Sequence, residues 1–107
     1  NIYCTKIASK LARTYTDKHG YKDLCRELLN ETISKVEQSS DWGGKLSKDQ
    51  REYAASDVLY LHKLKKKLDI ILERENRINI AKACFEFISH RTDLDLYGWQ
   101  DIDIFKH

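Results

Sequence analysis

The stretch Tyr53–Leu61, which reads YAASDVLYL, decides the fold of this chain. In a helix, positions three or four apart share one face, and the face that starts in this stretch continues well beyond it. Its members are Tyr53, Asp57, Leu61, Leu64, Leu68 and Ile71. The spacing predicts a long helix in which one acid, Asp57, stands in an apolar stripe.

The turns around Asp57 are apolar on their other faces as well. Their residues are Ala54, Ala55, Val58, Leu59 and Tyr60. A helix that is apolar nearly all round is normally enclosed by other elements, so we expect Asp57 to be enclosed. The positions three and four residues away, where a helical ion pair would form, hold no cation.

An enclosed carboxylate without a partner costs several kcal/mol unless a donor or a metal ion meets it. Three interpretations of Asp57 stay open. It is a buried acid bonded to a distant arginine or backbone donor, an acid that faces solvent because the enclosure is incomplete, or a metal ligand or catalytic acid.

A longer ordered string surrounds this acid. Ser40-Asp41-Trp42 and Leu46-Ser47-x-x-Gln50 precede the Y-x-x-x-D of Tyr53 and Asp57, in the order SDW…LSKDQREYAASDVLYL. The string over residues 40–64 resembles the third exonuclease motif of the ribonuclease D family, in the DEDDy group of 3′-5′ exonucleases and the ribonuclease H-like superfamily. The resemblance extends over nearly the whole chain. Proofreading domains of DNA polymerase I type differ, because they carry an acid where this chain has Ser56.

The resemblance implies a hydrolase that uses two divalent cations, Mg²⁺ or Mn²⁺, to remove nucleotides from the 3′ end of single-stranded RNA. Asp57 would be a metal ligand. Tyr53, one turn earlier and about 6 Å away along the helix axis, would orient the attacking water. Precursors of tRNA, or DNA, are further substrate classes that the resemblance allows.

The chain departs from the family pattern in its acids. The family's other three catalytic carboxylates lie in a D-x-E on a strand and in a later aspartate motif, and this chain contains no D-x-E. We therefore expect these ligands before Asn1. Residues 1–107 are then the mostly helical C-terminal part of a single α/β exonuclease domain, without a second domain, whose sheet lies largely in the missing N-terminal part. The isolated chain is expected to be inactive.

Composition limits the other possibilities. Nineteen Lys and Arg against 17 acids give a net charge of +2, which does not by itself indicate nucleic-acid binding. The three cysteines, Cys4, Cys25 and Cys84, are odd in number and widely spaced, which favours buried thiols in a reducing, cytoplasmic setting. No apolar run approaches the roughly 18 residues of a membrane span, so no membrane partner is expected. The oligomeric state stays open.

Apolar periodicity predicts further helices over residues 5–16, with Thr5 as N-cap, and over residues 21–29. Residues 30–46 read as a structured loop, and Ser47 with Gln50 fits a capping box that starts the long helix. Beyond Asn76 another helix is expected, ending near Arg91.

Three residues are candidates for substrate contacts. Trp42 would stack a base, or would only pin its loop onto a helix. Lys63 and Lys67, in a lysine run on the long helix, would follow the phosphates of RNA, or would only form a solvated face. If they bind without catalysis, the chain is a helical module for nucleic acid or a partner helix, which is the rival interpretation. A related DNA 3′-5′ exonuclease is a third.

The tail alternates acids with apolar residues. Asp93, Asp95 and Gly98 match three places of a calcium loop, but Ile104 stands where a bidentate glutamate is required. The tail is instead expected to lay its apolar side chains back on the domain. These are Leu94, Leu96, Trp99, Ile102 and Phe105.

Overall fold

The computed structural model describes the backbone of residues 2–33 and 48–107, and the side chains of residues 2–33 and 57–107. These residues form α1 (Thr5–Ala12), α2 (Tyr21–Leu28), α4 (Lys48–Arg74), α5 (Ile78–Leu94) and the π-helical turn η1 (Asp95–Trp99). The described ranges contain no strand, so the predicted, mostly α-helical character is confirmed. None of their helices has the length and apolar character needed to cross a membrane.

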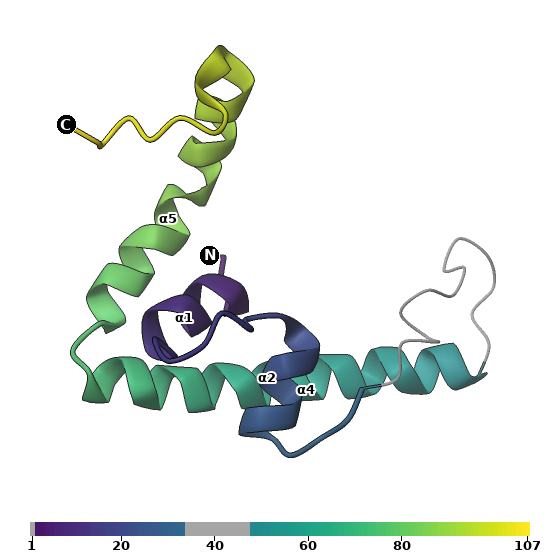
Figure 1. Ribbon diagram of the computed structural model, residues 1–107. Coiled ribbons are helices and arrows are strands. Elements are labelled where there is room, and N and C mark those ends of the chain that lie inside the picture. The colour runs from purple at the N-terminus through teal and green to yellow at the C-terminus, as the bar shows by residue number, and fades with distance from the viewer. Residues whose placement is uncertain (1, 34–47) are drawn as a thin grey trace.

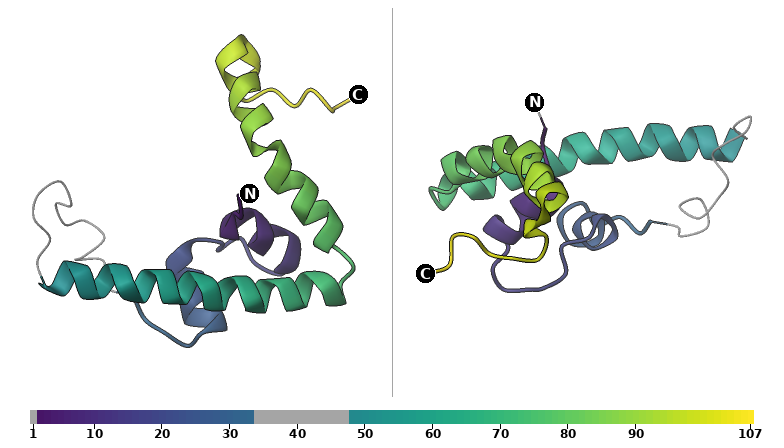
Figure 2. Two further views of the ribbon diagram at one scale, coloured as in Figure 1. Left: turned by 180° about the vertical axis from the view of Figure 1, so that it is seen from behind. Right: turned by 90° about the horizontal axis from the view of Figure 1, so that it is seen from above.

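The 27-residue helix α4 is the element on which the others are assembled (Figure 1). Helices α1 and α2 pack along the same side of it, and α5 rises steeply from its C-terminal end (Figures 1 and 2). The turn between α4 and α5 contains Asn76 in the left-handed conformation, φ 59°, which is a common way to end a helix. Arg77 then donates a hydrogen bond of 2.9 Å to the Leu11 carbonyl and so ties this turn to α1.

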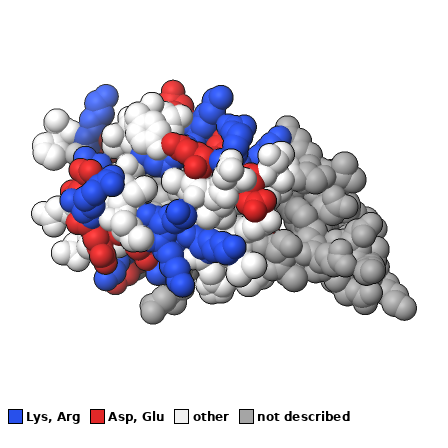
Figure 3. Space-filling view, turned by 90° about the horizontal axis from the view of Figure 1, so that it is seen from below, with Lys and Arg blue, Asp and Glu red and all other residues white. Residues whose placement is uncertain are grey.

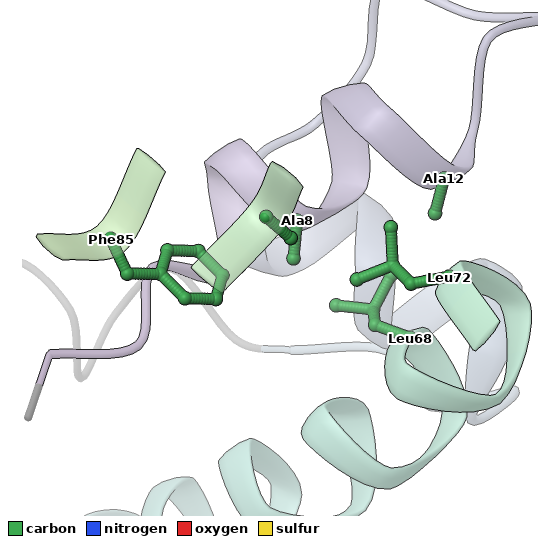
Figure 4. Packing of buried hydrophobic residues seen from close by; sticks show 6 residues of the cluster. Ala8, Ala12, Leu68, Leu72 and Phe85 are labelled. Carbon is green, nitrogen blue, oxygen red and sulfur yellow. The ribbon is translucent and has the colours of Figure 1, made fainter. Parts of the chain in front are cut away.

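The larger of two apolar clusters joins α1, α4 and α5 (Figure 4). Its buried members are Ala8 and Ala12 from α1, Leu68 and Leu72 from α4, and Ala81 and Phe85 from α5. Alanines on α1 let that helix approach α4 closely, so the leucines of α4 fill the space between the helices. Tyr3 closes one side of the cluster, with its ring centroid 4.7 Å from that of Phe85.

The second cluster joins α2 to the middle of α4. Leu24 and Cys25 from α2, Ile33, and Leu64 from α4 are buried in it. The predicted stripe of α4 is therefore confirmed at Leu64 and Leu68. Leu61 departs from it, because its side chain is 38% exposed.

The predicted enclosure of α4 is wrong for the described residues. Val58 and Leu59 are 56% and 53% exposed, next to the half-buried Asp57. The reason is that α1 and α2 cover only one side of α4, while the pattern of the sequence is apolar on several sides. The opposite faces of this section meet no other described element.

A buried polar cluster ends α1. Arg13, only 3% exposed, donates to the Ser9 hydroxyl (2.9 Å) and to the Lys18 carbonyl (2.6 Å), and it forms an ion pair with Glu27. These contacts fix the chain reversal between α1 and α2, so α1 ends at Ala12 and not at residue 16 as predicted. Its N-cap is Cys4 without a side-chain hydrogen bond, so the expectation for Thr5 is wrong.

The tail does not return to the body of the protein as expected. Leu96 and Phe105 are 78% and 67% exposed, and the Phe105 ring faces Phe87 of α5, with centroids 6.1 Å apart. The positive φ angles of Gly98 (107°) and Asp101 (62°) turn the chain at η1, so it runs away from α1 (Figure 1). Helix α5 also continues past Arg91 to Leu94.

Candidate functional site at Asp57

Helix α4 carries both residues of the Y-x-x-x-D motif. The four-residue spacing places Tyr53 about 6 Å before Asp57 along the axis, roughly one turn away. The Tyr53 side chain, Trp42 and the Ser47 cap lie outside the described residues and side chains. The roles of Tyr53 and Trp42 therefore stay predictions.

Asp57 lies half-buried where the start of α2 meets α4. Tyr21 is the first residue of α2 and lies near the Asp57 carboxylate. Burial, and then the nearby carboxylate, raise the pKa of Tyr21 well above its ordinary value of about 10. Tyr21 therefore stays neutral throughout the physiological pH range.

This environment differs from the first two interpretations left open by the sequence, a buried acid paired with an arginine and an acid that faces solvent, and the third, a metal ligand or catalytic acid, stays a prediction. Among the described residues, no arginine or lysine forms an ion pair with Asp57. The side chain is neither fully buried nor fully exposed, and the neutral phenol of Tyr21 from another helix lies near it. Tyr21 is not among the site residues predicted from the sequence, although the sequence contains a usable signal. A tyrosine on the apolar face of residues 21–29 has a hydroxyl that needs a partner once its ring is buried.

Cys25 lies one turn after Tyr21 and is fully buried. Burial raises the pKa of the Cys25 thiol above its ordinary value, and the carboxylates of Asp57 and Glu31 raise it further. A raised pKa lowers the thiolate fraction at any given pH, and the thiolate is the reactive form. Cys25 is thus the inert, buried thiol that the sequence favours, whereas Cys4 and Cys84 are half-exposed.

We expect iodoacetamide at pH 8 to alkylate Cys25 about tenfold or more slowly than Cys4 and Cys84, because burial limits both access and thiolate formation. Mass spectrometry of the digested protein at successive times measures the three rates. Denaturing the protein before labelling should make the rates similar. Equal rates in the native protein would contradict the buried position of Cys25.

Lys63 and Lys67 project into solvent from α4, about 9 Å and 15 Å beyond Asp57 along the axis. None of the ion pairs formed within the described part of the chain involves either lysine. Lys65 differs, since it pairs with Asp69 at 2.8 Å and stands 5.0 Å from the centre of the Tyr3 ring. Figure 3 shows Lys and Arg side chains interspersed with acids on the described underside of the molecule, so any basic surface is local.

The donor chemistry of Asp57 fits a hard divalent cation, because carboxylate oxygen is the ligand that Mg²⁺ and Mn²⁺ prefer. Residues 2–33 and 57–107 contain no group of three or more acids, histidines or cysteines able to hold a metal ion. If Asp57 is a metal ligand, as the sequence predicts, the other ligands have to come from outside these residues.

Comparison with known proteins identifies the family to which the chain belongs. A family model described as 3′-5′ exonuclease matches residues 1–73, which include α1, α2 and nearly all of α4. The chain belongs to the 3′-5′ exonuclease family. The motif at Tyr53 and Asp57 lies inside the matched region.

Curated relatives of this exonuclease-family chain are ribonucleases D. The ribonuclease D of Gluconacetobacter diazotrophicus is 35% identical over 79 residues, which are 73% of this chain and 20% of the relative. That of Xanthomonas oryzae pv. oryzae is 37% identical over 78 residues, or 72% of this chain and 21% of the relative. The chain thus spans about a fifth of the length of these relatives, and the predicted resemblance to ribonuclease D is confirmed.

Solved structures agree in fold. Brucella melitensis NrnC with bound Mg²⁺ is 58% identical and superposes with a TM-score of 0.79. The same protein bound to pGG is 60% identical, with a TM-score of 0.77. Each alignment covers 98% of this chain and 51% of the NrnC chain. The chain therefore corresponds to about half of these nucleases, and the predicted fold class, the helical portion of an exonuclease domain, is confirmed.

Proposed function

We propose that residues 1–107 form the C-terminal portion of a single exonuclease domain that shortens RNA from its 3′ end. The observation that carries the proposal is the half-buried carboxylate of Asp57. It lies within the family match, on a long helix and near the neutral phenol of Tyr21, and no cation among the described residues neutralises it. The names of the curated relatives support RNA as the substrate class.

Asp57 would hold a divalent cation, with Mg²⁺ supported by the Mg²⁺-bound NrnC structure and Mn²⁺ by the same ligand chemistry. When bound, a pair of such cations supplies charge stabilisation to the attacking and leaving oxygens of the phosphodiester. Tyr53, one turn earlier on the same helix, would orient the attacking water through its hydroxyl. The remaining carboxylates would come from outside this chain.

The experiment that tests the proposal compares this chain with the complete exonuclease domain that contains it. With 5′-labelled single-stranded RNA and Mg²⁺, the complete domain should produce a ladder of 3′-shortened products that EDTA removes. The chain alone should produce none, because it lacks the D-x-E carboxylates.

Two results would contradict the proposal. Shortening of RNA by the isolated chain would show that the further carboxylates are not needed. Metal-independent binding of RNA by the complete domain, without cleavage, would favour a non-catalytic nucleic-acid-binding module. Single-stranded DNA of the same sequence, assayed in parallel, decides between an RNA and a DNA exonuclease.

We also propose that Lys63 and Lys67 follow the RNA phosphates. Reversing both charges to glutamate should flatten the plot of log affinity against log salt by about 0.7 for each phosphate that the protein no longer neutralises, because fewer counterions are released. Fluorescence anisotropy in Ca²⁺ without catalysis measures this slope. The double reversal of Lys6 and Lys10 on α1, also exposed and four residues apart, is the matched control. Equal slopes for the two double variants would exclude the α4 lysines from the RNA-binding surface.

A further inference from the structure

A small hollow lies between the end of α5 and the tail that follows η1, with a volume of about 210 Å³. Three aromatic rings line it, Phe87 from α5, Trp99 from η1 and Phe105 from the tail. The rings of Phe87 and Phe105 meet edge to face, with centroids 6.1 Å apart. Sites for whole small molecules usually begin at about 300 Å³, so the hollow has room for a single side chain rather than for a cofactor.

The hollow also carries negative charge. The carboxylates of Asp101 and Asp103 line it, and none of the ion pairs among the described residues involves either of them. Arg91 is the one cation among the described lining residues, and it is already paired with Asp95 at 3.4 Å. Aromatic faces and uncompensated carboxylates therefore meet in one place, which is a combination that binds a cation.

We propose that this hollow binds an arginine side chain from a basic segment of another protein. A planar guanidinium stacks on aromatic rings and pairs with carboxylates at the same time, whereas a lysine ammonium offers only a point charge. The surrounding charge disfavours RNA, because residues 93–105 contain four aspartates and no lysine or arginine, and so repel phosphates. The inference adds a protein-binding surface to the proposed function and does not depend on it.

Hydrogen bonds of the tail hold the hollow in shape. The backbone N–H of Ile102 donates to the Trp99 carbonyl at 3.2 Å, and that of Phe105 donates to the Asp103 carboxylate at 2.9 Å. An ionised carboxylate has about four acceptor sites, so Asp103 keeps others for a cation. Asp101 adopts φ 62°, a left-handed turn that aspartate tolerates. A site formed in advance loses less conformational entropy when a partner binds.

The apolar surface around the hollow is open to such a partner. Trp99, Ile102 and Phe105 are 46%, 58% and 67% exposed. Apolar surface that lies together and is rimmed by charge marks an interaction site. We therefore expect a partner segment that places apolar residues beside its arginine.

The test uses the complete exonuclease domain and a fluorescein-labelled hexa-arginine peptide, whose binding at low salt is followed by fluorescence anisotropy. Trp99→Leu should raise the Kd about fivefold or more, because it removes a ring on which the guanidinium stacks. Tyr97→Leu is the matched control, since Tyr97 is an exposed aromatic residue of η1 outside the hollow, and its Kd should equal that of the native domain. A hexa-lysine peptide should bind the native domain more weakly than hexa-arginine.

A second pair of variants tests the charge. Asp101→Asn with Asp103→Asn should raise the Kd about tenfold, while asparagine at 103 can still accept from the Phe105 N–H. Glu73→Gln with Glu75→Gln is the control, because these acids are also exposed and two residues apart but lie at the end of α4, away from the hollow. It changes the net charge equally and should leave the Kd near the native value. Unchanged melting temperatures would show that all variants keep the fold.

Several results would overturn the proposal. Equal Kd values for Trp99→Leu and Tyr97→Leu, or for the two double variants, would mean that overall charge alone attracts the peptide. A loss of RNA binding in Trp99→Leu with unchanged peptide binding would assign the hollow to RNA. A native domain that binds no peptide and sediments as an oligomer, which Trp99→Leu dissociates, would assign the hollow to a second copy of the chain.

Discussion

Asp57→Asn should lower the rate at which the complete domain shortens RNA by about a thousandfold or more, equivalent to about 4 kcal/mol of transition-state stabilisation. Asparagine keeps the size and the polarity of the side chain, but it loses the negative charge that binds a hard cation. Helix α4 should therefore keep its structure while the metal site loses a ligand. Single-turnover kinetics on labelled RNA measure the rate.

Asp69→Asn is the matched control. Asp69 lies on the same helix, also has a phenol beside it, Tyr3, from which it accepts at 3.0 Å, and is also partly exposed. It differs in that Lys65 neutralises it at 2.8 Å. We expect its loss to change the rate less than about threefold, because an exposed ion pair of this kind contributes little. Similar rates for both variants would mean that Asp57 is an ordinary surface acid.

Leu68→Ala should destabilise the chain by about 2–5 kcal/mol, the usual cost of removing a fully buried leucine from a packed core. Leu68 is completely buried between α1 and α5 (Figure 4). Its neighbours on α1 are Ala8 and Ala12, which are too small to fill the space left behind. Urea denaturation followed by circular dichroism measures the free energy of unfolding.

Ile70→Ala provides the comparison for this core substitution. Ile70 is two residues further along α4, and its side chain is 64% exposed. Its truncation should change the free energy of unfolding by less than about 1 kcal/mol, since the side chain packs against little. A destabilisation as large as that of Leu68→Ala would mean that the two faces of α4 are assigned the wrong way round.

The apolar periodicity of the sequence correctly predicted the buried face of α4. Leu64 and Leu68 lie on the buried face of α4 because a helix brings positions four apart together, and Asp57 continues that face. The same pattern does not predict which of the other faces of α4 are covered by the described residues. Val58 and Leu59 read as enclosed for this reason, although more than half of each side chain is exposed.

Periodicity cannot predict contacts between individual side chains that are far apart in the sequence. Tyr21 lies near Asp57 because the α1–α2 reversal places α2 against α4. That reversal depends on the Arg13 side chain, whose hydrogen bonds to Ser9 and to the Lys18 carbonyl end α1 early. Neither contact has a periodic signature. The tail was mispredicted similarly, because alternating apolar residues do not identify the surface that they contact.

Helix α4 is continuous from Lys48 to Arg74, so Asp57 and the buried Leu68 and Leu72 belong to the same helix. If altered packing shifted this helix by one turn along α1, Asp57 would move by about 5.4 Å. Metal–oxygen bonds of about 2 Å tolerate only a small fraction of such a displacement. The packing of Leu68 and Leu72 against α1 therefore fixes the position of α4 along its axis, and with it the position of the Asp57 carboxylate.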